Sequence, residues 1–143
     1  MAELDPQAAV LVTDDDRDAI DLLRMRLTRA GVTRPVQAFY SAEMLIAYLE
    51  AAASPAGNGR PMPCALFLDL SLPRMSGFEA LAWIRKRPAF QGVKVIVVSN
   101  SSQPADIEKA YQLGADVFQM KYPTAETLAL IIASPRNVAS TQA

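Results

Sequence analysis

The chain has 143 residues, a length typical of one domain with a single hydrophobic core. Its hydrophobic fraction of 51% excludes a disordered chain, and its formal charge of −1 argues against a strongly basic surface for nucleic acid. The lack of histidine removes the commonest general base and the commonest metal ligand from the available chemistry.

The sequence indicates a cytoplasmic protein. The first residues lack the basic and apolar regions of a signal peptide, and no apolar run approaches the ~20 residues of a membrane span. The single cysteine, Cys64, has no partner for an internal disulfide, which is typical of a reducing compartment. Because Cys64 lies just before an apolar run, we expect it to be buried by packing rather than reactive.

The first part of the chain alternates β-rich and amphipathic helical segments. Residues 8–13 form a continuous apolar run, as in a strand buried on both faces, and acidic residues 14–16 follow it. Helical spacing of apolar residues over 18–30 predicts a helix ended by Gly31, with Arg24, Arg26 and Arg29 on a solvated face. Residues 36–40 predict a second strand, and Ser41 predicts the N-cap of a second helix.

The second part continues the alternation after residues 54–63, which have the composition of a surface loop. Strands are predicted over 65–68, 93–98 and 117–120. A helix follows each of them, the first carrying Leu81 and Ile84, and the others covering 104–113 and 124–132. Five strands that are each followed by a helix predict an α/β fold with a parallel sheet, helices on both faces and right-handed crossovers.

Acidic residues follow two of the predicted strands. Asp14 and Asp15 come directly after the first strand, and Asp69 comes directly after the third. Sites in open α/β sheets form beyond the carboxyl ends of strands, so the three carboxylates would meet if these strands are neighbours. Three like charges repel one another unless a cation lies between them, and oxygen ligands with few other donors suit Mg²⁺.

Two more polar residues end strands at the same predicted edge. Ser99 ends the fourth strand, and Lys121 follows the fifth. A hydroxyl and an ammonium facing a carboxylate–metal cluster would form a cradle for a phosphoryl group, and Asp69 could then attack phosphorus as a nucleophile. Taken singly, an aspartate is often a helix cap, a lysine a surface residue and a serine a turn residue. The placement of all five residues at strand ends favours a site.

Four motifs resemble those of response-regulator receiver domains, over a match from about Ala8 to Ile132. They are Val-Leu-Val-Thr-Asp-Asp-Asp at 10–16, Leu-Asp-Leu-Ser-Leu-Pro-Arg-Met-Ser-Gly at 68–77, Val-Ile-Val-Val-Ser at 95–99 and Leu-Gly-Ala-Asp-Val-Phe-Gln-Met-Lys at 113–121. The resemblance implies a flavodoxin-like, doubly wound sheet with strand order 2-1-3-4-5. It also implies a receiver domain over residues 7–133, and we expect residues 134–143 to be a short tail without an output domain.

The resemblance assigns a role to each residue of the expected site. Asp69 would be the phosphoacceptor, and Lys121 would pair with its phosphoryl group. Ser99 would be the switch hydroxyl that turns toward the phosphoryl group, and Phe118 would be the aromatic switch residue. The protein would therefore be a phosphoacceptor signalling domain of a two-component phosphorelay rather than an enzyme.

The resemblance also implies a Mg²⁺ site. Its ligands would be Asp14, Asp15, Asp69 and the backbone carbonyl of Ser71, with Asp15 a direct ligand and Asp14 acting through water. The run of three aspartates allows a register one residue later, in which Asp15 and Asp16 are the acidic pair.

The implied partner is a sensor histidine kinase. The long loop at 54–63 and the segments 86–90 and 99–102 are similar to those of small stand-alone regulators that work with phytochrome-type kinases. Members of that group pair through the face made by the fourth helix, fifth strand and fifth helix. A homodimer of this kind would place Tyr111, Phe118, Tyr122 and Leu130 on that face, although Phe118 and Leu130 could equally pack onto the sheet.

The sequence departs from the family pattern at Tyr122. Receivers usually have Lys-Pro after the fifth strand, with a cis peptide bond at the proline, whereas this chain has Lys121-Tyr122-Pro123. Because a non-proline cis bond costs ~3 kcal/mol, we expect no cis bond in the usual place. This leaves the placement of Lys121 open.

Two other functions are compatible with parts of the pattern. A haloacid-dehalogenase-type phosphatase would also use an aspartate after a strand, but Ser71 stands where that class usually has a second aspartate. A receiver-like scaffold without phosphotransfer would have no need of all five polar residues. A flavodoxin-like redox domain is disfavoured, since residues 14–16 would repel the phosphate of a flavin nucleotide.

Overall fold

A computed structural model describes residues 8–54 and 62–134 of the protein. Five parallel strands form one sheet in the order β2-β1-β3-β4-β5, which is the order that the family resemblance implied. Their bounds are β1 Ala9–Thr13, β2 Val36–Phe39, β3 Pro63–Leu68, β4 Lys94–Ser99 and β5 Val117–Met120. The strand that leads to Asp69 is therefore the centre of the sheet, between the strands that lead to Asp14 and to Ser99.

A helix follows each strand, and the predicted ends of strands and helices are correct to within two residues. The helices are α1 Arg17–Arg29, α2 Ala42–Ala53, α3 Gly77–Arg85, α4 Pro104–Gln112 and α5 Ala125–Ala133. A short 3₁₀ helix, η2 Pro88–Phe90, was not predicted. Pro88 stands in its first turn, where a missing N–H costs little.

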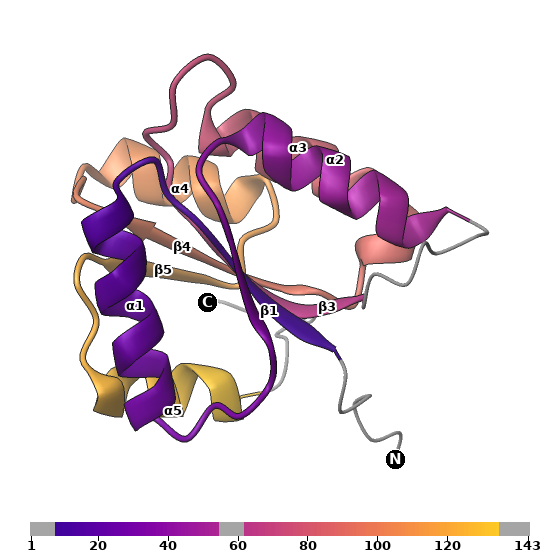
Figure 1. Ribbon diagram of the computed structural model, residues 1–143. Helices are drawn as coiled ribbons and strands as arrows, with labels where there is room; N and C mark the ends of the chain where they lie inside the picture. The colour runs from indigo at the N-terminus through magenta and orange to yellow at the C-terminus, as the bar shows by residue number, and fades with distance from the viewer. Residues whose placement is uncertain (1–7, 55–61, 135–143) are drawn as a thin grey trace.

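Helices cover both faces of the sheet, as Figure 1 shows. Side chains of successive strand residues point to opposite faces, so Leu11 and Leu66 pack on one side while Val12 and Phe67 pack on the other. The first cluster is completed by helices α2, α3 and α4, and the second by α1 and α5, through residues that include Leu45, Leu81, Ala110, Ile20 and Leu128. The sheet thus has two separate hydrophobic cores, and the polar residues are left at its carboxyl edge.

Local sequence signals explain where the helices begin. Ser41 caps α2 as predicted, its hydroxyl accepting a hydrogen bond from the backbone N–H of Met44. Ser76 and Glu79 form a reciprocal capping box at α3. After α1, Gly31 adopts φ +96°, which confirms the predicted left-handed position. Two of these signals mark the start of a helix, and the third marks the end of one.

Parts of three predictions fall on residues that the structure does not describe. Residues 55–61 of the predicted surface loop, residue 7 at the predicted domain start and residues 135–143 of the predicted tail lie outside the described ranges. Within those ranges, no helix has both the length and the apolar character needed to cross a membrane.

Candidate functional site

The end of β1 places two acidic side chains differently. The backbone N–H of Asp14 donates to the carbonyl of Phe39 at 3.1 Å, which extends the pairing of β1 with β2 by one residue. The Asp14 residue is only 8% exposed, and its Oδ1 accepts from the backbone N–H of Asp16 at 2.9 Å. Asp15 is exposed at the mouth of the site.

The third aspartate of the run serves the helix. Asp16 is the N-cap of α1, and its carboxylate accepts from the backbone N–H of Asp18 at 3.0 Å. The carboxylates of Asp14 and Asp15, by contrast, lie close to that of Asp69. The geometry therefore favours Asp14 and Asp15 as the acidic pair over the alternative register.

The end of β3 places Asp69 in the middle of the edge. Its backbone N–H donates to the carbonyl of Thr13 at 3.1 Å. Asp69 is buried, with 5% of the residue exposed. Its Oδ1 accepts from the backbone N–H of Ser71 at 3.3 Å. Ser71 itself is exposed, two residues further along the loop.

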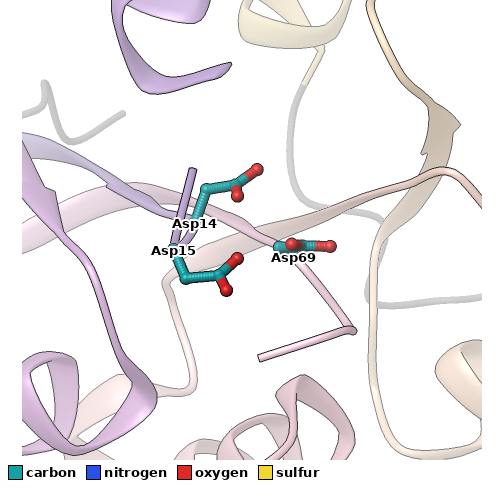
Figure 2. Close-up of side chains that lie close together, drawn as sticks. All are labelled: Asp14, Asp15 and Asp69. Carbon is teal, nitrogen blue, oxygen red and sulfur yellow. The ribbon is translucent and has the colours of Figure 1, made fainter. Parts of the chain in front are cut away.

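The three carboxylates form one group. Each of Asp14, Asp15 and Asp69 offers an oxygen, and these atoms all lie within 4.8 Å of one another. Figure 2 shows Asp14 and Asp15 on one segment of chain, with Asp69 on the neighbouring one. Burial raises the pKa of Asp69, and the negative charge of Asp14 raises it further, against the opposing effect of Lys121. All-oxygen ligands and uncompensated negative charge are what a hard divalent cation such as Mg²⁺ requires.

Lys121 reaches into the same group from the end of β5. Its Nζ lies 2.7 Å from Asp14 Oδ2 and 3.5 Å from Asp69 Oδ2, and its side chain is buried. Burial alone would lower the pKa of Lys121, but the hydrogen bond to Asp14 and the charges of Asp69 and Asp14 raise it overall. The raised pKa keeps the ammonium positively charged beside the two carboxylates. The two distances also settle the position of Lys121, which the sequence left open.

The expectation about the neighbouring peptide bond was wrong: the Lys121–Tyr122 peptide is cis. Contacts on both sides determine the path of the chain here. The backbone N–H of Lys121 donates to the carbonyl of Ser99 at 2.9 Å, while Arg26 donates to the carbonyl oxygens of Tyr122 and Pro123. Local preference, on which the sequence argument rested, does not include these contacts.

Ser99 is the last residue of β4, and Phe118 lies on the neighbouring strand β5. Ser99 is buried, and its hydroxyl oxygen accepts from the backbone N–H of Ser101 at 3.0 Å. Ser101 in turn donates its hydroxyl to Asp106 in the first turn of α4 at 2.6 Å. Phe118 is partly buried against the core beneath α2, α3 and α4, and its backbone N–H donates to the hydroxyl of Tyr111.

Two contributions to the site were missed or misread from the sequence. Arg26 was expected on a solvated face, but it is half-buried and contacts the segment after β5. The Ser101–Asp106 hydrogen bond was not foreseen, although serine before a helix with an acidic residue in its first turn is a recognisable local signal. No comparable local signal marks Arg26, because its contacts lie 96 and 97 residues away.

Comparison with known proteins agrees with this geometry. A family model for the response regulator receiver domain matches residues 10–133. The chain therefore belongs to the response-regulator receiver family, whose members are phosphoacceptor signalling modules rather than classical enzymes. The match does not support a haloacid-dehalogenase-type phosphatase or a flavodoxin-like redox domain.

The individual relatives share a third or less of their residues with this chain over the matched regions. Transcriptional regulatory protein GltR of Pseudomonas aeruginosa is 33% identical over 136 residues, which cover 94% of this chain and about half of GltR, 51%. The phosphorylated cyanobacterial phytochrome response regulator RcpA has a similar structure, with a TM-score of 0.73 and 25% identity over 88% of this chain and 89% of RcpA. The Mn(2+)-bound form of response regulator Rcp1, a protein of Synechocystis sp., has a TM-score of 0.72 at 20% identity over 95% and 96% of the two chains.

Proposed function

We propose that the protein accepts a phosphoryl group on Asp69 from the phosphohistidine of a sensor histidine kinase. The observation that carries this proposal is the position of Lys121, whose ammonium lies between the carboxylates of Asp14 and Asp69 in a largely buried pocket. The Lys121 ammonium is held in this pocket at a cost in desolvation energy. It suits a site where further negative charge arrives.

In the proposed reaction an Asp69 carboxylate oxygen attacks phosphorus in line. A P–O bond forms as the P–N bond to the kinase imidazole breaks, and the product is an acyl phosphate. Lys121 Nζ lies 3.5 Å from Asp69 Oδ2. A small movement would therefore bring it to the oxygens of a phosphoryl group on Asp69. Its positive charge would offset the negative charge on those oxygens.

The same pocket would hold Mg²⁺. Asp14, Asp15 and Asp69 offer converging oxygens, and the backbone carbonyl of Ser71 is the fourth proposed protein ligand. When bound, the cation would neutralise charge on the transferring phosphoryl group. The Mn(2+)-bound form of Rcp1, which has a similar fold, supports a divalent cation in receivers of this shape.

Phosphorylation would act on the rest of the molecule through Ser99 and Phe118. The Ser99 hydroxyl would turn toward the phosphoryl oxygens and leave the N–H of Ser101, to which it is now bonded. Phe118 would then rotate inward on β5, changing the face made by α4, β5 and α5. Exposed apolar side chains are available on that face for a partner or a second copy of the chain, namely Tyr111, Tyr122 and Leu130.

The kinase proposed as partner is of the phytochrome type. Support comes from RcpA, a cyanobacterial phytochrome response regulator of similar structure. In this proposal the protein works in the cytoplasm as a single receiver domain over residues 7–133. The downstream signal would pass through protein contacts on the α4–β5–α5 face.

The decisive experiment is phosphorylation of the purified protein with acetyl phosphate and Mg²⁺, followed on Phos-tag gels. The wild type should give a retarded band that hydroxylamine removes, as expected for an acyl phosphate. Asp69→Asn should give none, and the matched control Asp21→Asn, an exposed aspartate on α1, should behave as the wild type. Equal labelling of the wild type and Asp69→Asn would overturn the assignment, and no labelling of the wild type would favour the scaffold alternative.

A further inference from the structure

Arg26 joins helix α1 to the segment that carries Lys121. Its Nη1 donates to the carbonyl oxygen of Tyr122 at 3.3 Å and to that of Pro123 at 3.1 Å. These residues directly follow Lys121, and α5, which begins just after them, lies against α1 (Figure 1). One nitrogen of one side chain thus holds two consecutive carbonyl groups of the connection between β5 and α5.

The connection is short and is held at both of its ends. On the strand side, the backbone N–H of Lys121 donates to Ser99 at 2.9 Å. On the helix side, Thr124 caps α5 by accepting from the backbone N–H of Thr127 at 3.1 Å. Between these points the chain follows neither a strand nor a helix, and Tyr122 is 46% exposed. Arg26 binds the chain in this interval.

The position of this interval sets the position of the Lys121 side chain. A lysine side chain has several rotatable bonds and loses entropy when its ammonium is fixed, so a displaced backbone readily leads to a displaced ammonium. The Lys121 ammonium has to stay between Asp14 and Asp69 to act in the proposed reaction. A misplacement of about 1 Å in such a site can cost on the order of 100-fold in rate.

We infer that Arg26 is a positioning residue, which acts through the backbone at Tyr122 and Pro123 to hold the Lys121 ammonium beside Asp14 and Asp69. The inference rests on the proposed function, since it gives Lys121 its task. Its physical content is independent of phosphotransfer, because it concerns how rigidly one ammonium group is held. Arg26 itself contacts neither Asp14 nor Asp69 through any described hydrogen bond or ion pair.

The first test measures the Lys121 ammonium directly by NMR, using Lys121→Met to assign its signal. In Arg26→Met the side-chain order parameter of the Lys121 ammonium should fall, while backbone amide signals of β1 and β3 stay in place. Arg24→Met, which removes an exposed arginine from the same helix, should leave the order parameter unchanged. An unchanged order parameter in Arg26→Met would overturn the inference, whether or not the protein accepts phosphate.

The second test compares labelling rates with acetyl phosphate. Arg26→Met should be slower than the wild type by about tenfold, and Arg26→Lys, which keeps a donor for the two carbonyl groups, should be intermediate. If Arg26 acts through Lys121, the double variant Arg26→Met, Lys121→Met should be no slower than Lys121→Met alone. Additive losses would contradict the inference. An unlabelled wild type would count against the proposed function only, since the NMR result would still decide the role of Arg26.

Discussion

The backbone of Gly77 lies directly against the carbonyl group of Asp69. A Cβ atom at Gly77 would overlap the Asp69 carbonyl oxygen and lie 2.7 Å from the Cα of Leu70, and the N–H of Gly77 donates to the carbonyl of Leu70 at 3.0 Å. The first residue of α3 therefore packs on the backbone of the proposed phosphoacceptor. Only a residue without a side chain fits between them.

Gly77→Ala should consequently destabilise the protein by about 1–3 kcal/mol, because backbone atoms at Asp69 and Leu70 must move to admit a methyl group. Labelling of Asp69 should fall with it. Urea unfolding followed by circular dichroism measures the first effect. Gly92→Ala is the matched control, since nothing lies within 4 Å of a Cβ there, and it should change stability by less than about 0.5 kcal/mol. Equal effects of the two substitutions would contradict the close packing.

A buried ion pair fixes the opposite end of the sheet. Arg85 Nη2 lies 2.9 Å from Asp116 Oδ2, the two side chains are 9% and 3% exposed, and Arg85 also donates to the carbonyl groups of Phe90 and Gly114. Arg85→Met should lower the free energy of unfolding by about 3–5 kcal/mol, because it leaves the buried carboxylate without its cation. Urea unfolding provides the measurement.

The exposed pair of Arg74 and Glu43 supplies the comparison. Its atoms are 3.4 Å apart, and the side chains are 69% and 42% exposed. Water and salt screen such a pair, so Arg74→Met should shift the urea midpoint far less than Arg85→Met. A similar shift in both variants would mean that burial does not decide the strength of these ion pairs.

The reactivity of Cys64 should depend on pH in a characteristic way. The thiol is half-buried, and burial raises its pKa, although the nearby charge of Arg34 acts in the opposite direction. At mildly alkaline pH the folded protein should therefore hold less thiolate than the urea-unfolded chain, and iodoacetamide should alkylate it more slowly. Rates measured in both states across the alkaline range check this. A faster reaction in the folded state would reverse the expected sign.

The same pKa direction predicts an effect on stability. Because the folded-state pKa of Cys64 is raised, its stabilising contribution is complete below the pKa of the unfolded chain and is lost as pH rises through the folded-state pKa. As pH rises from the unfolded-state pKa to the folded-state pKa, the free energy of unfolding should therefore fall less in Cys64→Ala than in the wild type.

Removing the charge of Asp69 should stabilise the protein in the absence of divalent cations. Burial and the charge of Asp14 raise the pKa of Asp69, so its contribution to stability is present at low pH and is lost as pH rises through the folded-state pKa. At neutral pH, Asp69→Asn should thus have a higher urea midpoint than the wild type in EDTA.

Addition of Mg²⁺ should reverse that order. At a concentration 100 times the dissociation constant, the cation should stabilise the wild type by about 2.7 kcal/mol, because the unfolded chain does not assemble the carboxylates. Asp69→Asn and Asp15→Asn should respond much less. Equal stabilisation of wild type and both variants would argue against a cation at this site.

Much of the site could be predicted because it depends on where strands end. Asp14 and Asp69 follow apolar runs that are recognisable in the sequence, and parallel strands bring their carboxyl ends to one edge. Ser99 and Lys121 obey the same rule at β4 and β5. These placements need only the period of the hydrophobic pattern and the strand order.

Features that depend on contacts distant in the sequence could not be predicted. Neither the cis peptide bond after Lys121 nor the hydrogen bonds from Arg26 on α1 to the segment after β5 left a local signal in the sequence. Propensity and periodicity describe neighbours along the chain, so Arg26 looked like any other arginine on a polar helix face. The hydrogen bond from the Ser101 hydroxyl to Asp106 is local, so the sequence at the start of α4 does carry a signal for it.

The late position of Lys121 in the chain has a consequence for synthesis on the ribosome. The three strands β2, β1 and β3 are adjacent in the sheet, and all of them are complete once residue 68 has been made. Once Asp69 has been added it can meet Asp14, more than 50 residues before Lys121 is made. A nascent chain stalled at this stage would hold the two carboxylates close together without Lys121 to offset their charge.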